Sequence, residues 1–377
     1  MCVLITPTDV YVRYMGRTWQ DAARKAIFFN WSGSGFEVHF FGTKLVAEIE
    51  AFPDERPLEG KCLPYVQMII DGDVSKESRI ELKEGVHCYT LQKTAKAEEH
   101  HIAMIKLSEN ARGRNCLVGL YADGELLPPG DDRRPYIEFV GDSITCGFGN
   151  EQKNEDPFLT ARENVLETYA AYAARQLDCQ MQMICLSGIP LCWSPDSSRH
   201  IRMPMEPYLE IDRRTMEICY PYTDWVQQQS DGGAQPEIWN FAQRVPVAVV
   251  INLGTNDAFR LSVTEDHGVE ERHFYERYLA FLKMVRRFNG PTPVISCTLG
   301  PMNYYLYDVI IQAVEAYRKE TGDARIFCLK FGAIDIWKEG YGGGAHPNVS
   351  THRRMGRELA DALKLWLKDG RRKEDAK

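Results

Sequence analysis

The amino-acid sequence predicts an all-β sandwich of jelly-roll type followed by an α/β domain whose parallel sheet lies between helices. Apolar and polar residues alternate at the period of strands in the first third of the chain, whereas strand-length and helix-length runs alternate in the remainder. Prolines, a glycine and a run of charges separate the two regions at residues 128–135. A length of 377 residues fits two domains, at about 100–200 residues per domain.

Strand signals in the first third come from alternation and from turn residues. Apolar residues alternate with polar ones over Gly35–Phe40, Gly42-Thr43 interrupts the pattern, and Leu45–Ile49 resumes it. The turn signal Asp71-Gly72-Asp73 closes a further apolar run. Short strands at this spacing, without helical periodicity between them, are typical of a sandwich or jelly roll. The other expected strands are Val66–Ile70, His101–Leu107 and Cys116–Tyr121.

The proline-rich break sets the expected domain boundaries. Residues 1–127 form the β-sandwich, 128–135 the linker and 136–370 the second domain, and the polar residues 371–377 form a tail.

The second domain reads as alternating strands and helices. Phe274, Tyr278, Phe281 and Val285 recur at helical spacing, and the strand-length runs are continuously apolar. This pattern predicts a parallel sheet covered on both faces, with functional groups at the carboxyl ends of its strands. The expected strands are Tyr136–Val140, Met181–Leu186, Val247–Leu253, Val294–Leu299 and Ile326–Phe331. The expected helices are Asn164–Leu177, Glu271–Phe288, Tyr307–Thr321 and Val349–Lys368.

Composition excludes several classes of protein. Hydrophobic residues make up 44% and charged residues 26%, as in ordinary globular proteins. A protein that binds nucleic acid through electrostatic attraction usually carries an excess of basic residues. The net charge of -8 therefore argues against a nucleic-acid partner. The longest uncharged stretch, Phe288–Tyr307, contains three prolines and two glycines, so no membrane-spanning segment and no membrane partner are expected. The N-terminus has no basic and apolar leader, which favours a cytoplasmic location.

The cysteines and histidines do not suggest a metal site. The eleven cysteines are scattered without a C-x-x-C pair, so they are expected to be free thiols packed as small hydrophobes. Structural zinc requires clustered ligands, so we expect neither a metal nor another cofactor.

Four strand ends carry polar residues or glycines that are suited to one site. Ser143 follows the first strand in Gly-Asp-Ser-Ile-Thr, and Gly188 follows the second. Asn256 follows the third strand in Gly-Thr-Asn-Asp, and His346 precedes the last helix in Ala-His-Pro-Asn. Taken singly, each has an ordinary explanation as a turn residue, an Asx-turn acceptor or a solvated loop histidine. It is their order on successive elements that favours a function.

These blocks resemble those of the SGNH hydrolase superfamily, also called GDSL-type esterases. The match spans about Tyr136 to Leu365, and the resemblance implies a flavodoxin-like sheet. The upstream Trp31-Ser-Gly-Ser-Gly35 segment, together with the Gly-Asp-Ser-Ile-Thr-Cys-Gly-Phe-Gly block, is similar to carbohydrate esterase family 2. Members of that family join a jelly-roll, carbohydrate-binding-like domain to the hydrolase domain and remove acetyl groups from mannan- or xylan-type sugars.

The resemblance implies a role for each of the four residues. Ser143 would be the nucleophile and His346 its general base, with an acyl-enzyme intermediate. The oxyanion hole would consist of the Ser143 and Gly188 N–H groups and the Asn256 side-chain amide.

The chain departs from the superfamily pattern just before the histidine. The superfamily places an aspartate two or three residues upstream, where this chain has Gly344 and Gly343. We hypothesise a Ser-His dyad in which a main-chain carbonyl, reached through the run Gly342-Gly343-Gly344, orients His346. Asp335, the nearest upstream aspartate, is expected to belong to the loop after the fifth strand.

Substrate recognition is expected to involve aromatic side chains, because sugars stack on rings. Most of these candidates are expected to be packing residues, and one or two to contact an acetylated oligosaccharide. The candidates are Trp193, Tyr304, Tyr305, Trp337 and Tyr341.

Two other functions stay open beside the acetyl esterase: a lipase or thioesterase of the same superfamily, and a non-catalytic carbohydrate-binding protein. The sugar, the position of its acetyl group and the oligomeric state are also open.

Overall fold

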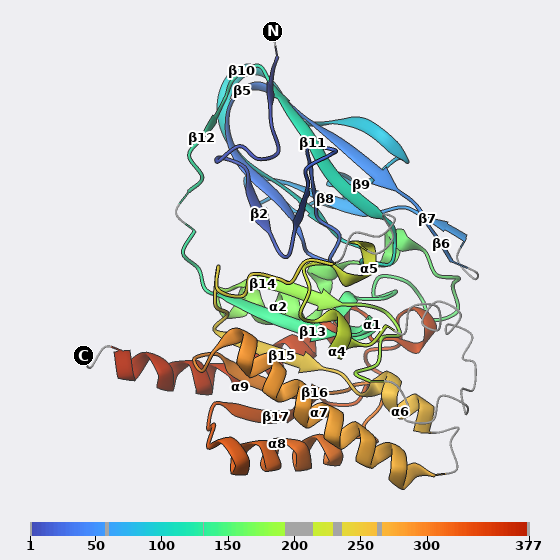
Figure 1. Ribbon diagram of the computed structural model, residues 1–377. Helices are drawn as coiled ribbons and strands as arrows, with labels where there is room; N and C mark the ends of the chain where they lie inside the picture. The colour runs from blue at the N-terminus through green and yellow to red at the C-terminus, as the bar shows by residue number, and fades with distance from the viewer. Residues whose placement is uncertain are drawn as a thin grey trace.

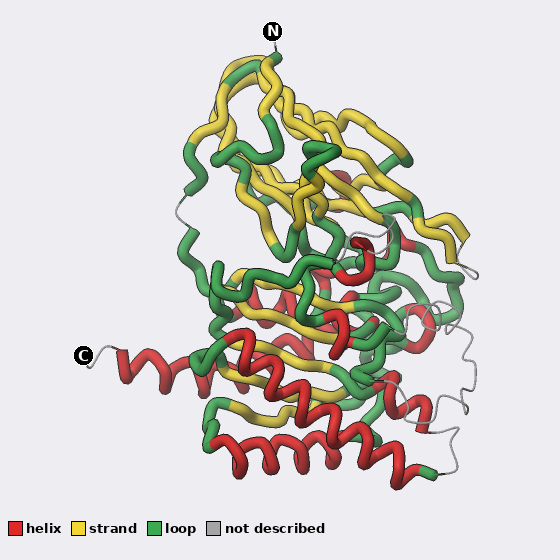
Figure 2. Tube along the Cα trace, viewed as in Figure 1, coloured by secondary structure: helices red, strands yellow, loops and turns green. Residues whose placement is uncertain are grey.

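The computed structural model describes residues 2–56, 60–130, 132–192, 214–228, 236–261 and 266–374. Strands dominate the N-terminal module, and helices surround the sheet of the C-terminal module (Figure 1, Figure 2). This arrangement confirms the predicted order of an antiparallel β-module followed by an α/β module with a parallel sheet. A jelly-roll topology of the first module stays a prediction.

The N-terminal module is built on two long antiparallel strands, β5 (Gly35–Phe52) and β10 (Gly85–Lys106). In the described residues its ten-stranded sheet has the main order β3-β4-β11-β5-β10-β8-β9, with β1, β2 and β12 paired at its margins. The remaining strands are β1 (Val3–Ile5), β2 (Arg13–Met15), β3 (Trp19–Asp21), β4 (Ala26–Phe28), β8 (Tyr65–Ile70), β9 (Arg79–Glu81), β11 (Arg114–Ala122) and β12 (Glu125–Leu127). A separate hairpin joins β6 (Asp54–Arg56) to β7 (Gly60–Cys62), and a 3₁₀ turn, η1, spans Lys76–Ser78.

The predicted interruption at Gly42-Thr43 is wrong, because β5 runs through it. The Asp123 carboxylate accepts the N–H groups of Thr43 and Lys44 at 2.9 and 2.8 Å, which holds the strand where its neighbour is irregular. The register shift lies on the partner strand instead, between Lys93 and Glu98 of β10. A bulge places the extra residues on one strand and leaves the other continuous.

The C-terminal module has a five-stranded parallel sheet in the order β14-β13-β15-β16-β17 among the described residues. Helices α7 and α8 pack on one face and α2 and α9 on the other, so both faces are apolar, as continuous apolar strands predict. The strands are β13 (Tyr136–Gly141), β14 (Gln180–Cys185), β15 (Ala248–Asn252), β16 (Val294–Leu299) and β17 (Ile326–Lys330). The helices are α1 (Ser143–Cys146), α2 (Tyr169–Gln176), α4 (Met216–Cys219), α5 (Trp225–Gln228), α6 (Thr255–Leu261), α7 (His267–Asn289), α8 (Tyr307–Thr321) and α9 (Val349–Glu374), with 3₁₀ turns η2 (Thr160–Arg162), η3 (Val165–Glu167) and η6 (Gly343–Ala345).

The helix expected over Asn164–Leu177 begins later than predicted. Asn164 accepts the N–H of Leu166 and starts only a 3₁₀ turn, and Thr168 then accepts the N–H of Ala171 as the N-cap of α2. Short polar side chains compete for backbone N–H groups, so they divide a run that is otherwise rich in helix-forming residues.

Buried polar contacts join the two modules. Arg17 of the N-terminal module pairs with Glu138 of β13 at 3.1 Å, and neither side chain is exposed. The same guanidinium donates to the carbonyl oxygens of Tyr220 and Tyr222 at 2.5 and 2.7 Å. The Trp31 indole N–H donates to Thr223 O at 2.8 Å, so the described part of the segment between β14 and β15 is also tied to the N-terminal module.

All eleven cysteines are free thiols, as expected, but Cys2 and Cys88 are exposed and so do not pack as small hydrophobes. In the described part of the chain, no helix combines the length and the apolar character needed to cross a bilayer.

We predict that Arg17→Met lowers the free energy of unfolding by about 3–5 kcal/mol, because it leaves the Glu138 carboxylate buried without its cation. Urea denaturation followed by intrinsic fluorescence measures the change. Arg24→Met is the matched control, because Arg24 pairs with Asp21 while 41% exposed. The control is expected to cost less than about 1 kcal/mol, and equal losses in the two variants would contradict the prediction.

Candidate functional site

The site lies at the carboxyl edge of the parallel sheet. β13 pairs with both β14 and β15, and Gly141 at its end is level with Cys185 on one side and Asn252 on the other. The loops that follow these three strands therefore emerge side by side. Ser143 and Asn256 lie in the first turns of α1 and α6, which follow β13 and β15, and Gly188 lies in the turn after β14.

Ser143 is the first residue of α1 and is held by a tight turn. Asp142 precedes it as N-cap, and its carboxylate accepts the N–H of Ile144 at 3.0 Å. A Cβ on Gly141 would lie 2.0 Å from Thr145 Oγ1, so the turn has room only for glycine there. The serine itself is largely buried, with 8% of its surface exposed.

The structure brings Ser143 and His346 together across the sheet edge. Ser143 Oγ lies 2.8 Å from His346 Nε2. His346 Nδ1 lies 3.0 Å from Gly344 O and 3.2 Å from Gly343 O. Carbonyl oxygens only accept hydrogen bonds, so Nδ1 carries the ring proton and Nε2 presents its lone pair to the hydroxyl.

The turn that supplies these carbonyls is held from the loop after α1. Gly343 N donates to Gly149 O at 2.9 Å, and Ala345 N donates to the Asn154 side chain at 2.6 Å. Gly344 and Ala345 both have positive φ, 57° and 59°, a conformation that glycine adopts without the cost a Cβ imposes. Ala345 is the one of these two residues that has a Cβ, and the Asn154 side chain therefore anchors it in this conformation.

Burial is the main influence on the imidazole. It lowers the pKa of His346, against the opposing effects of the two carbonyl contacts and of Glu109. The Phe148 ring packs against the imidazole, with ring centroids 4.7 Å apart. A second histidine, His352, is fully buried and accepts the N–H of Tyr169 at Nδ1. Burial lowers the pKa of His352 to about 3, so both rings are held neutral.

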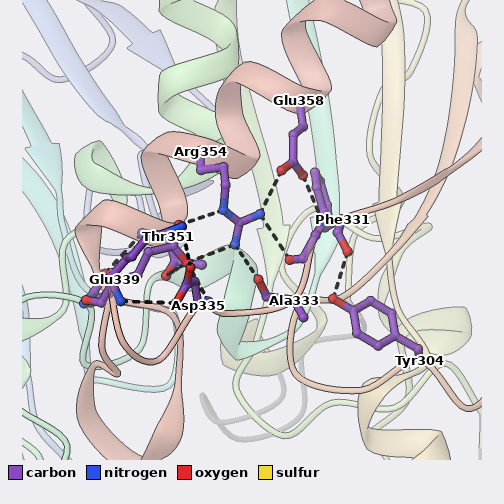
Figure 3. A network of polar contacts seen from close by, with 11 residues as sticks. Tyr304, Phe331, Ala333, Asp335, Glu339, Thr351, Arg354 and Glu358 are labelled. Atoms are coloured by element: carbon purple, nitrogen blue, oxygen red, sulfur yellow. Dashed lines mark hydrogen bonds and ion pairs between the residues drawn. The ribbon is translucent and has the colours of Figure 1, made fainter.

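The two acids upstream of His346 are engaged elsewhere. Asp335 accepts the N–H of Lys338 at 3.2 Å, and Glu339 accepts from Arg354 Nε at 2.7 Å. Figure 3 shows both acids in the polar network around Arg354 and α9, which also includes Glu358. The partners described for His346 Nδ1 are the carbonyl oxygens, as the sequence-based hypothesis expects.

Gly188 lies in a turn next to Ser143, and Asn256 lies in the first turn of α6. Gly188 has φ of 76° in a turn closed by Ile189 N donating to Leu186 O at 3.2 Å. The Asn256 amide donates to Ile189 O at 3.0 Å and reaches Asp142 Oδ2 at 3.4 Å. Asn256 thus links the segment that follows β14 to the segment that follows β13.

Asp142 and Asp257 also lie here, and burial raises the pKa of Asp142 to about 7. Asp257 accepts the N–H groups of Leu191 and Cys192, in keeping with the structural role expected for it.

The structure separates the aromatic candidates. Tyr341 lines a polar cavity of about 650 Å³ beside the His346 segment, together with residues 150–156. Trp337 is 97% exposed on the loop that leads to this segment. Tyr304 instead donates to Phe331 O at 2.8 Å (Figure 3), and the Tyr305 hydroxyl lies 3.1 Å from His267 Nδ1 at the start of α7. Trp193 lies outside the described residues.

Sequence reasoning missed the buried neighbours of the site, above all Glu109. Its carboxylate lies with Cys146 and Glu163, and their ligand atoms are within 4.8 Å of one another. The Arg112 guanidinium stands 3.0 Å from Glu109 and 3.7 Å from Glu163, so both carboxylates are paired with a cation of the protein. Glu109 precedes the proline-rich break, and no local motif marks it.

Comparison with known proteins gives matches over both modules. Residues 14–129 match the family model "Carbohydrate esterase 2 N-terminal", and residues 137–359 match "GDSL-like Lipase/Acylhydrolase". The chain is 30% identical to the cellulase/esterase CelE of Acetivibrio thermocellus over 89% of its length, and spans 37% of that protein. It is 24% identical to an acetylxylan esterase / glucomannan deacetylase of Cellvibrio japonicus, covering 96% of this chain and 90% of that one.

Solved structures show the same fold over nearly the whole chain. A family two carbohydrate esterase from Clostridium thermocellum, in complex with cellohexaose, has a TM-score of 0.73 at 28% identity, covering 94% of this chain and 98% of that one. An acetyl xylan esterase from Butyrivibrio proteoclasticus has a TM-score of 0.80 at 21% identity, covering 96% and 98%. The chain therefore belongs to the GDSL-like lipase and acylhydrolase family of carboxylic ester hydrolases and carries the N-terminal domain of carbohydrate esterase family 2.

Proposed function

We propose that this protein is a serine esterase that removes O-acetyl groups from acetylated oligosaccharides derived from xylan or from mannan and glucomannan. The observation that carries the proposal is the 2.8 Å contact between Ser143 Oγ and the unprotonated Nε2 of a neutral His346. A hydroxyl is a poor nucleophile unless a base takes its proton as it attacks, and this pair supplies both groups.

The reaction follows from that geometry as a dyad mechanism. Ser143 Oγ bonds to the acetyl carbon while its proton passes to His346 Nε2, and the carbonyl oxygen becomes an oxyanion. The imidazolium then gives this proton to the sugar oxygen as the carbon–oxygen bond to the sugar breaks, leaving acetyl-Ser143. Water repeats the sequence: it loses a proton to His346, attacks the acetyl carbon, and releases acetate as Ser143 regains its proton.

The oxyanion would be stabilised by the Ser143 N–H, the Gly188 N–H and the Asn256 amide. Donors already fixed at that position stabilise the developing charge without rearranging. The amide hydrogen of Asn256 that faces Asp142 across 3.4 Å is the one available to the oxyanion, because the contact it gives up is long and weak.

Sugar recognition is assigned to the polar cavity beside His346 and to the exposed indole of Trp337. The cavity is lined by Asn150, Glu151, Asn154, Tyr341 and Asn348, among others, whose polar groups suit sugar hydroxyls. The name of the Cellvibrio relative and the cellohexaose bound to the Clostridium structure support a carbohydrate substrate over a lipid.

We predict that the wild-type protein releases acetate from acetylated xylo- or manno-oligosaccharides and that Ser143→Ala abolishes the release. An enzyme-coupled acetate assay measures both proteins. Asp335→Ala is the matched control and is expected to retain full activity, since its carboxylate is bonded to the Lys338 backbone.

The same preparations separate the alternative functions. A preference for long-chain over acetyl 4-nitrophenyl esters would instead indicate a lipase or thioesterase. A folded wild type that neither releases acetate nor reacts with a fluorophosphonate would indicate a non-catalytic sugar-binding protein.

We predict that Asn256→Ala lowers kcat by about a hundred- to a thousand-fold, the usual effect of removing one oxyanion donor, with KM little changed. Steady-state hydrolysis of 4-nitrophenyl acetate gives both constants, and circular dichroism checks the fold. Asn303→Ala is a suitable control because, within the part of the chain that the structure describes, its side chain accepts the N–H of Tyr305 and contacts none of the proposed catalytic residues. If kcat falls by less than tenfold, Asn256 is not part of the oxyanion hole.

The pH dependence follows from the lowered pKa of His346. The neutral imidazole is the active form, so kcat/KM falls as the pH falls through the pKa of the folded protein. Because burial lowers that pKa, we predict that the acid limb lies below about 6.5, the ordinary histidine value. A pH profile of kcat/KM measures it, and a limb at or above the ordinary value would contradict the prediction.

A further inference from the structure

A fully buried carboxylate of the N-terminal module reaches the catalytic edge of the other module. Glu109, in the loop between β10 and β11, has no exposed surface. Its Oε2 accepts the N–H of Ser187 at 2.6 Å, a contact across 78 residues of sequence. Cys146 Sγ, at the end of α1, lies 3.6 Å from the same oxygen.

The Ser187 contact fixes the turn that carries Gly188. Ser187 and Gly188 are the central residues of the turn closed between Leu186 and Ile189, and the positive φ of Gly188 is the value its third position requires. A charged acceptor makes a stronger hydrogen bond to a backbone N–H than a neutral one. Glu109 therefore sets the orientation of the peptide just before the Gly188 N–H.

Its pairing with Arg112 extends this influence to the histidine side of the site. Arg112 lies 3.0 Å from Glu109 and stacks over the Phe158 ring at 4.3 Å. Phe158 stacks on Phe148, whose ring packs against His346. The Glu109–Arg112 ion pair of the N-terminal module thus contacts both the Gly188 turn and the pair of phenylalanine rings that packs against His346.

We propose that Glu109 is a positioning residue for the esterase reaction: it holds the Ser187–Gly188 turn and places a negative charge beside the Ser143–His346 pair. The inference rests on the proposed function. α1 runs from Ser143 to Cys146, so the carboxylate that contacts Cys146 lies about one helical turn from the nucleophile. In a site whose histidine is oriented by neutral carbonyls, this carboxylate supplies the charge that stabilises the imidazolium.

Other charged groups around Glu109 set the balance of that charge. Arg112 compensates part of it, Glu163 adds a second carboxylate, and Lys106 donates to Gly113 O nearby in the same module. Burial lowers the pKa of Lys106 to about 7, and burial raises that of the Cys146 thiol, which stays protonated. Glu109 also acts to raise the pKa of His346, whereas the buried His352 is held neutral.

The test compares Glu109→Gln with Glu138→Gln in hydrolysis of 4-nitrophenyl acetate. Glu138 is a matched control, because it too is a buried, ion-paired glutamate, here with Arg17 across the module interface, and the contacts described for its side chain are to Arg17, Gln182 and Tyr220, none of them a proposed catalytic residue. We expect Glu109→Gln to lower kcat about ten- to a hundred-fold, the scale of a small misplacement in a catalytic site. The acid limb of kcat/KM moves to lower pH, because the imidazolium loses a stabilising negative charge. Glu138→Gln leaves both quantities at the wild-type values.

The variant Glu109→Asp separates the effect of the negative charge from the effect of side-chain length. It keeps the negative charge but is too short to hold Ser187, so kcat falls while the acid limb stays at the wild-type pH. Titration of active sites with a fluorophosphonate corrects kcat for any unfolded fraction, and the pH of the limb is independent of enzyme concentration. The proposal is overturned if Glu109→Gln matches Glu138→Gln in kcat, or if its acid limb does not move. An inactive wild type would count against the proposed function, whereas active wild type with unaffected Glu109→Gln would count against this inference alone.

Discussion

The parallel pairing of β13 with both of its neighbours is the constraint on which the candidate site depends. Gly141 is level with Cys185 and Asn252, so the next few residues of three loops are forced to one edge of the sheet. Helices on both faces bury the strands and fix this register, because a shift would expose apolar side chains from both layers. Loops anchored to such a frame hold polar groups within hydrogen-bond distance of one another.

The histidine is placed by a different device, a glycine-rich turn anchored to the serine loop. Gly149 accepts the N–H of Gly343 and the Asn154 side chain accepts the N–H of Ala345, so one backbone and one side-chain hydrogen bond tie together the segments that carry Ser143 and His346. Carbonyl oxygens fix the imidazole tautomer as a carboxylate would, but carry no full charge. The groups that fix the tautomer of His346 therefore differ, in this site, from the group that places a negative charge beside it.

Motif and periodicity predicted the elements that local sequence controls. The parallel strands and α8 fall where the apolar runs indicate, and Ser143 and His346 meet as the ordered blocks imply. One error arose where a distant side chain decides the outcome, because Asp123 keeps β5 continuous through Gly42. Another arose from local capping, because Thr168 restarts the helix. Glu109 escaped prediction because its partner Ser187 is distant in sequence and lies in the other module, and no motif marks Glu109 itself.

The interface between the modules gives the N-terminal domain a part in the site itself. Among the described residues β14 is an edge strand, and an uncovered edge exposes unpaired backbone groups. Figure 1 shows the N-terminal module on the β14 side of the parallel sheet. A Cβ added to Gly33 of the β-module would lie 3.0 Å from Met181 Cε and 3.5 Å from Met183 Cγ of this strand, so the two modules approach closely here. The loop that follows β14 carries Ser187 and Gly188, and Glu109 holds it from the same side. A module that covers the edge strand and supplies a buried charge to its loop is a structural part of the esterase, so its contribution to the reaction does not require that it bind sugar.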